Sequence, residues 1–129
     1  MTKHPERVAL IAFAVILVAA CAPTVVERPP VEFRATSSAL LAEIVDYGLD
    51  QQPTAAMTPF RVESESPTSV VLLSEVTGVF PIAPRFTRLS FSVVQRDDIS
   101  SLVVIATGHN AADTAERFIL YLASVFPRL

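Results

Sequence analysis

Four consecutive stretches between Phe60 and Thr107 carry the residue patterns of β-strands. They are residues 60–65, 70–77, 86–96 and 99–107. In the third stretch apolar and polar residues alternate, with Leu89, Phe91 and Val93 on one face and Arg88, Ser90, Ser92 and Arg96 on the other. Ser66-Pro67-Thr68-Ser69 and Asp97-Asp98 have turn composition and separate neighbouring stretches. Consecutive strands with short turns predict an antiparallel meander of four strands.

Helical spacing appears before and after the predicted strands. Thr36-Ser37-Ser38 supplies N-caps for a helix over residues 39–47, and Gly48 is expected to end it in the left-handed conformation. Asn110 is expected to cap a last helix of about four turns, with Asp113 completing a capping-box-like pair. The apolar stripes of the two helices are Leu40, Leu41, Ile44, Val45 and Tyr47, and Ala115, Phe118, Ile119, Leu122, Val125 and Phe126.

These elements predict an α+β fold over residues 36–129. A meander with one apolar face needs cover, which the N-terminal and C-terminal helices can supply on that face, giving a two-layer sandwich. Residues 31–34 also alternate, so an extra edge strand is the alternative. With that strand the topology resembles a reduced helix-grip fold, a class that binds hydrophobic ligands.

The first 20 residues have the order of a secretory signal peptide. Lys3 and Arg7 form a basic head, and residues 8–20 are then entirely apolar. This run is too short to span a bilayer, which takes about 20 apolar residues. The sequence predicts a signal peptide over residues 1–20.

Val18-Ala19-Ala20-Cys21 closes the apolar run and resembles the lipobox of bacterial lipoproteins. The resemblance implies cleavage between Ala20 and Cys21, and a diacylglycerol on the Cys21 thiol. Cys21 is the only cysteine in the chain, so its acylation would leave no free thiol in an oxidising compartment. Two alternatives are an ordinary signal peptide cut at the same bond and an uncleaved signal anchor.

Residues 21–35 are expected to be the lipidated cysteine and an extended tether, because three prolines fall between Ala22 and Pro30. The residue after Cys21 is Ala22 rather than Asp, which resembles the pattern sorted to the outer membrane, facing the periplasm. In a cell without an outer membrane the outer face of the plasma membrane would hold the protein.

Charge argues against nucleic acid as a partner. Cleavage after Ala20 leaves 109 of the 129 residues and removes Lys3, Arg7 and Glu6. Eight arginines and twelve acidic residues remain, for a net charge of about −4. Nucleic-acid binding calls for a clustered basic face instead.

Residues that could carry chemistry fit structural roles better. His109 with Asp113 lacks a nucleophile or a second histidine, and Asp97-Asp98 fits a hairpin turn. Glu43 and Asp46 fit an exposed helix stripe, and Glu63 and Glu65 fit a solvated sheet face beside Arg61. The sequence predicts no catalytic residue, no metal site and no cofactor.

One loop is apolar where loops are normally polar. Val79, Phe80, Pro81 and Ile82 either fold back over the edge of the core or form a contact surface for a partner or lipid. The sequence favours a non-catalytic envelope lipoprotein, held to the membrane by its lipid, that binds a protein partner or supports envelope structure. The alternative is a carrier of a small apolar ligand or lipid held between sheet and helices.

Overall fold

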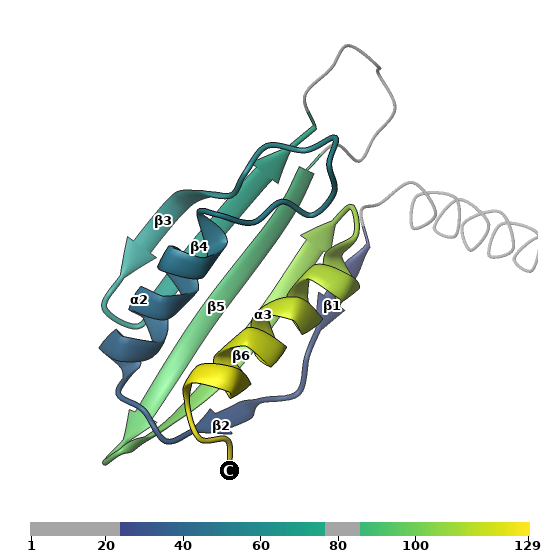
Figure 1. Cartoon of the computed structure of the whole chain (residues 1–129). Coiled ribbons are helices and arrows are strands. Elements are labelled where there is room, and N and C mark those ends of the chain that lie inside the picture. Colours follow the sequence, from purple (N-terminus) through teal and green to yellow (C-terminus); the bar gives the residue numbers. More distant parts are fainter. Residues whose placement is uncertain (1–23, 77–85) are drawn as a thin grey trace, which may run out of the picture.

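The computed structural model describes residues 24–76 and 86–129. Within these residues the chain forms an α+β domain with one antiparallel sheet of six strands and two helices (Figure 1). The elements are β1 (Val25–Glu27), β2 (Val31–Phe33), α2 (Ser37–Gly48), β3 (Arg61–Ser66), β4 (Ser69–Glu75), β5 (Phe86–Arg96), β6 (Ile99–Gly108) and α3 (Ala111–Val125).

The sheet order is β1-β6-β5-β4-β3, and β2 also pairs with β6. The predicted meander is confirmed as β3 to β6, but four strands was too few, because β1 and β2 both pair with the free edge of β6. Val26 lies opposite Ala106 and Val31 opposite Leu102. Pro29 and Pro30 separate the two short strands, since proline has no N–H to donate to a ladder.

Residues 24–33 therefore do not form the predicted free tether. Three prolines in nine residues predict an extended tether between the lipid and the domain. In the structure the prolines only interrupt the pairing, and the residues on either side of them pair with β6. The predicted edge strand near residues 31–34 is present as β2.

Both helices lie on one face of the sheet (Figure 1). Phe91 from the centre of the sheet packs against Phe118 of α3, with 5.3 Å between ring centroids, and Phe118 also meets Phe60 edge-on. The largest fully buried side chains are Phe33, Phe91, Phe118, Leu40, Ile44, Met57, Leu72, Leu89, Leu102, Leu122, Val70 and Val104. The inward set predicted for residues 86–96 is confirmed, since Leu89, Phe91 and Val93 are all buried.

The predicted left-handed conformation of Gly48 at the end of α2 is wrong. Gly108 is the positive-φ glycine of the described residues, and the residue after Gly48, Leu49, is right-handed. A Cβ on Gly48 would lie 2.5 Å from Cδ1 of Leu72 on β4. A side chain at this position would therefore require Leu72 or the end of α2 to shift.

The caps of the two helices differ. Thr36 caps α2 as predicted, with its Oγ1 accepting a hydrogen bond from the Ala39 N–H at 3.2 Å. Asn110 precedes α3 but is left-handed, with φ of 55°, and makes no side-chain cap. Its amide instead donates to the Pro53 carbonyl at 2.8 Å, so the predicted capping role is wrong. Asn110 fastens the loop after α2 to the start of α3.

The C-terminal residues 127–129 run along the outside of β2. The Arg34 N–H donates to the Pro127 carbonyl at 2.8 Å, and the Leu129 N–H donates to the Glu32 carbonyl at 3.0 Å. The edge of β2 is therefore partly satisfied, which lowers its tendency to pair with another chain.

Candidate functional site

The open sheet face is the face of the sheet turned away from α2 and α3. On each strand it is formed by the residues that alternate with the core positions. Strand pairing aligns Val71, Ser90, Ile105 and Glu27 in one row across it, and Ser69, Ser92 and Val103 in the next. In the part of the chain that the structure describes, no helix covers this face.

The centre of the open sheet face is uncharged. Between Arg88 and Arg96, β5 directs Ser90, Ser92 and Val94 outward, and β6 directs Ser101, Val103, Ile105 and Thr107 outward. Val94 is 64% exposed and Ile105 is 36% exposed. Hydroxyl and aliphatic groups thus meet solvent along the two longest strands of the domain.

Paired charges border this centre on the β3 side. Arg88 forms a two-pronged ion pair with Glu63, with N–O distances of 3.0 and 3.2 Å, and its guanidinium lies 5.2 Å from the Phe86 ring centroid. Arg61 pairs with Glu75 at 3.3 Å. These exposed pairs contribute little to stability, since such pairs are typically worth about 0.2–1 kcal/mol.

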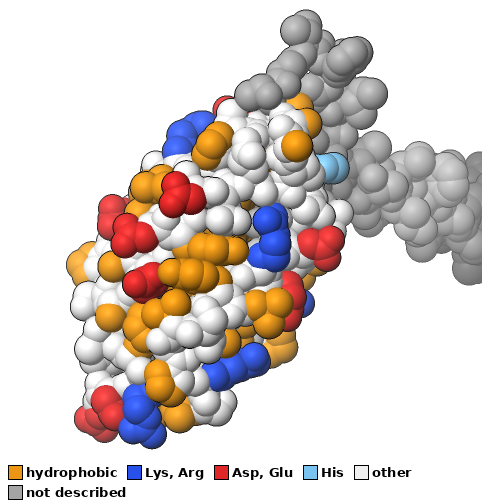
Figure 2. All heavy atoms as spheres, in the orientation of Figure 1, with side chains coloured by type: hydrophobic (Ala, Val, Ile, Leu, Met, Phe, Trp, Pro, Cys, Tyr) orange, Lys and Arg blue, Asp and Glu red, His pale blue; other side chains and the backbone are white. Residues whose placement is uncertain are grey.

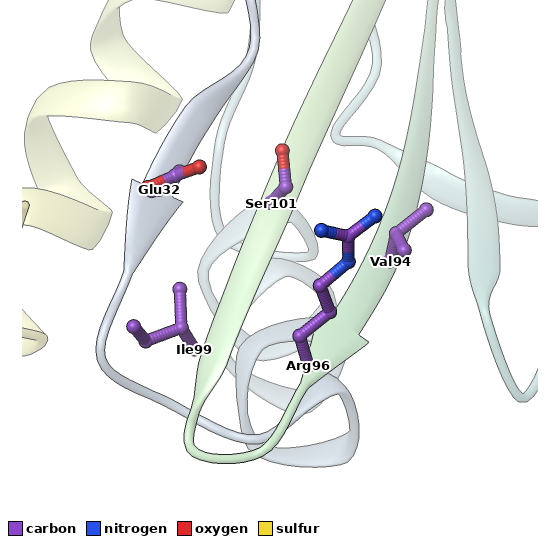
Figure 3. A pocket seen from close by; sticks show the side chains of 5 residues that line it. All are labelled: Glu32, Val94, Arg96, Ile99 and Ser101. Atoms are coloured by element: carbon purple, nitrogen blue, oxygen red, sulfur yellow. The ribbon is translucent and has the colours of Figure 1, made fainter.

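A shallow hollow of about 290 Å³ opens at the other end of the face. Val94, Ile99 and Ser101 line it, and Glu32 from β2 and Arg96 from β5 stand on either side of Ser101 (Figure 3). Among the described residues, neither the Glu32 carboxylate nor the Arg96 guanidinium has an ion pair or a side-chain hydrogen bond. Two unpaired charges of opposite sign therefore flank an uncharged floor.

The helix-bearing side has a different surface. There, charged side chains of both signs interrupt the apolar ones (Figure 2). Tyr47 of α2 stacks on Tyr121 of α3 with 4.0 Å between ring centroids, and the Tyr121 hydroxyl donates to Glu43 at 2.8 Å. The Glu43 carboxylate raises the pKa of Tyr121, because ionisation of the phenol would lose this bond and place two anions together. Glu43 thus joins the two helices.

A second hollow, of about 150 Å³, lies where the segment between β1 and β2 meets α3. Its lining includes Arg28 and Glu116, which form an ion pair. This pair connects the proline-containing segment between β1 and β2 to α3.

The structure places His109 in the exposed turn between β6 and α3. Its backbone N–H donates to the Phe86 carbonyl at 2.9 Å, and its carbonyl accepts from the Thr87 hydroxyl. Among the described contacts, the side chains of His109 and Asp113 share neither a hydrogen bond nor an ion pair. His109 connects a strand to a helix through its backbone.

The other acidic candidates are also dispersed. Asp97 takes the left-handed conformation of the predicted hairpin turn, and Asp98 pairs with Arg34 at 2.9 Å. The sequence predicts Glu65 on the same face of β3 as Arg61, and this prediction is wrong. A register shift between Val62 and Ser64 brings Glu65 opposite buried Val70, which places it on the other face. Within residues 24–76 and 86–129, His, Cys, Asp and Glu do not gather in groups of three or more.

The predicted lipidation and cleavage residues, Ala20 and Cys21, lie outside the described residues, as does the apolar loop with Val79, Phe80, Pro81 and Ile82. No helix among the described residues is long and apolar enough to cross a membrane. Comparisons with protein-family models, with curated proteins and with solved structures found no match to this chain.

Proposed function

We propose that this protein is a lipid-anchored protein of the bacterial cell envelope whose non-catalytic domain docks a protein partner on the open sheet face. The observation that carries the docking proposal is the uncharged centre of that face, bordered by charge. Protein interfaces have the same arrangement, with charged residues depleted at the centre and a polar rim around it. The lipobox-like sequence ending at Cys21 carries the anchoring proposal.

The size and chemistry of the open sheet face suggest which kind of partner would fit. Five strands lie side by side along the sheet. At about 4.8 Å between strands and roughly eight residues of 3.3 Å each, the face spans on the order of 600 Å². A standard interface buries about 800 Å² of each partner. The open sheet face would thus form most of an interface of standard size. The fitting partner is a protein that brings aliphatic and hydroxyl groups to the centre of this face, an acidic group to Arg96 and a basic group to Glu32.

The packing between sheet and helices favours docking over the alternative of a ligand carrier with a helix-grip-like fold. A carrier holds its ligand between the sheet and the long helix. In this domain the rings of Phe33, Phe91 and Phe118 occupy that layer and are fully buried. A ligand there would have to displace packed aromatic side chains.

The anchor is tested by Cys21→Ser in cells fed a labelled fatty acid. The wild-type protein should take up the label and fractionate with membranes, by our proposal the outer membrane, or the plasma membrane in cells that lack one. The Cys21→Ser variant should lose the label, because the thiol that receives the lipid is gone. Label retained by that variant would contradict the anchoring proposal.

The docking face is tested by Val94→Glu, with Leu120→Glu on the outer side of α3 as the matched control. The two side chains are 64% and 58% exposed, so both variants should fold. Chemical crosslinking in whole cells should give one adduct of fixed mass with the wild type and with Leu120→Glu. Val94→Glu should reduce that adduct at least tenfold, since the new carboxylate must be desolvated on association and can occupy Arg96, which the acidic group of the partner would otherwise meet. An adduct that is equally strong in both variants argues against this face, and an adduct of twice the chain mass identifies a second copy as the partner.

A further inference from the structure

The ordered domain begins very close to the proposed lipid. Thr24 is three positions after Cys21. The Gly108 N–H donates to the Thr24 carbonyl at 2.9 Å, and Val25 directly follows as the first residue of β1, opposite Thr107. From Thr24 onward the chain is therefore fixed to the edge of β6.

Three residues cannot carry the domain far from a membrane. A fully extended chain spans at most about 3.3–3.6 Å per residue, so Thr24 lies within roughly 11 Å of the Cys21 Cα. That is less than the length of any of the strands β3 to β6, which have six to eleven residues. If Cys21 is acylated, the end of the domain that holds Thr24 must lie close to the lipid surface.

Strand pairing defines which end this is. Gly108 lies opposite Thr87, and Thr87 lies opposite Ser74, so the row that begins at Thr24 crosses the sheet. The turn at His109 lies just beyond it. We call this the anchor end. The far end is the hairpin at Asp97-Asp98, which is separated from the anchor end by the ten residues of β6, or about 33 Å.

The exposed residues near the anchor end include Thr24, Ala55 and Ala112, together with the acidic Glu75 and Asp113. The far end carries the Arg34–Asp98 ion pair, a second aspartate, and the unpaired charges of Glu32 and Arg96. Both ends therefore carry charge, and the short connection to Cys21 is what distinguishes the anchor end.

We propose that the anchor end rests on the bilayer to which Cys21 is attached, and that the hollow between Glu32 and Arg96 points away from it. This inference rests on the proposed lipid anchor and adds the orientation of the domain. The occupant of the anchor end is the lipid surface, and the far end is left free for a partner.

The orientation can be measured because Cys21 is the only cysteine and would be consumed by the lipid. His109→Cys and Asp98→Cys would each give the full chain a single free thiol at one end of the domain. The lipidated variants, extracted from cells and labelled with a donor dye, are placed in phosphatidylethanolamine–phosphatidylglycerol vesicles that carry an acceptor dye on the headgroups. Energy transfer should be strong from position 109 and weak from position 98. Equal transfer, or stronger transfer from position 98, would overturn the orientation.

A spacer variant supplies the control. About twelve Gly and Ser residues inserted after Pro23 leave the lipobox intact and reach roughly 20 Å on average. The transfer from position 109 should then fall, and the difference between the two positions should narrow. An unchanged difference would contradict the short connection as the cause of the orientation.

Vesicle flotation of the same samples separates the two proposals. Protein that does not float with vesicles lacks the anchor, and both proposals then fail. Protein that floats but shows no difference between positions 98 and 109 keeps the anchor and loses only the orientation.

Discussion

The two faces of the sheet are made by the same strands, yet they differ in what they contact. On β5, Leu89 and Phe91 are fully buried beneath the helices, while Val94 on the other face is 64% exposed. One face accounts for most of the apolar burial and hence for most of the folding free energy. The residues at the centre of the other face stay at least partly exposed and contribute less to stability, so their composition is free to serve contacts with another molecule.

The strongest test of this comparison is Phe91→Ala against Val94→Ala. Phe91 is fully buried against Phe118, so its loss should lower the free energy of unfolding by about 3–5 kcal/mol. Val94 is exposed, and its truncation should change that energy by no more than about 0.5 kcal/mol. Denaturant unfolding of residues 24–129 measures both. Similar losses in the two variants would mean that the open sheet face is covered in the free protein.

Gly48→Ala should lower the free energy of unfolding by an intermediate amount, and it tests how closely α2 packs on the sheet. The new Cβ would lie 2.5 Å from Cδ1 of fully buried Leu72, so α2 or Leu72 must shift. We expect a loss of about 1–3 kcal/mol, as for other overpacked sites. Leu72→Ala removes that atom, so in the double variant the added cost of Gly48→Ala should fall. Additive losses would show that the close approach is not the cause.

The smallest expected effect is a shift in the titration of Tyr121, which lies at the outer surface of the helix layer. The hydrogen bond to Glu43 raises its pKa above the ordinary value of 10.0. Because the folded-state pKa is higher than the unfolded one, the associated stabilisation is complete below pH 10 and is lost as the pH rises through the folded-state pKa. In a Tyr47→Phe background, the ultraviolet titration of Tyr121 should shift to lower pH in Glu43→Gln. An unshifted titration would exclude Glu43 as the cause.

A feature of this fold could be predicted from the sequence when neighbouring residues determine it, and could not when residues far apart in the chain determine it. The β3–β6 meander and both helices could be predicted because alternation and helical spacing are local patterns. β1 could not, because three residues before a proline pair carry no pattern of their own, and their partners on β6 are about 80 positions away. The role of Gly48 could not be predicted for the same reason, since it depends on the distance to Leu72.

The candidate site was only partly visible in the sequence. The run from Val103 to Ala106, apolar on both faces of its strand, was a signal that the outward side of β6 is not an ordinary polar surface. Glu32, Ser101 and Arg96 lie close together only because of the register of three strands. Glu32 is far from the other two residues in the chain. The bulge in β3 moved Glu65 away from Arg61, and no residue type in that strand marks it.

The pairing of both chain ends near one edge of the sheet has a consequence for how the protein folds. Val25 pairs with Thr107, and Leu129 bonds to Glu32, so the edge is complete only when nearly the whole chain is available. Contacts between distant residues form slowly, because the intervening loop must close first. In a chain that emerges N-terminus first, β1 and β2 have no strand to pair with until β6 follows about 70 residues later. If the beginning of the chain is already held by lipid, this last pairing step draws the domain down onto the membrane.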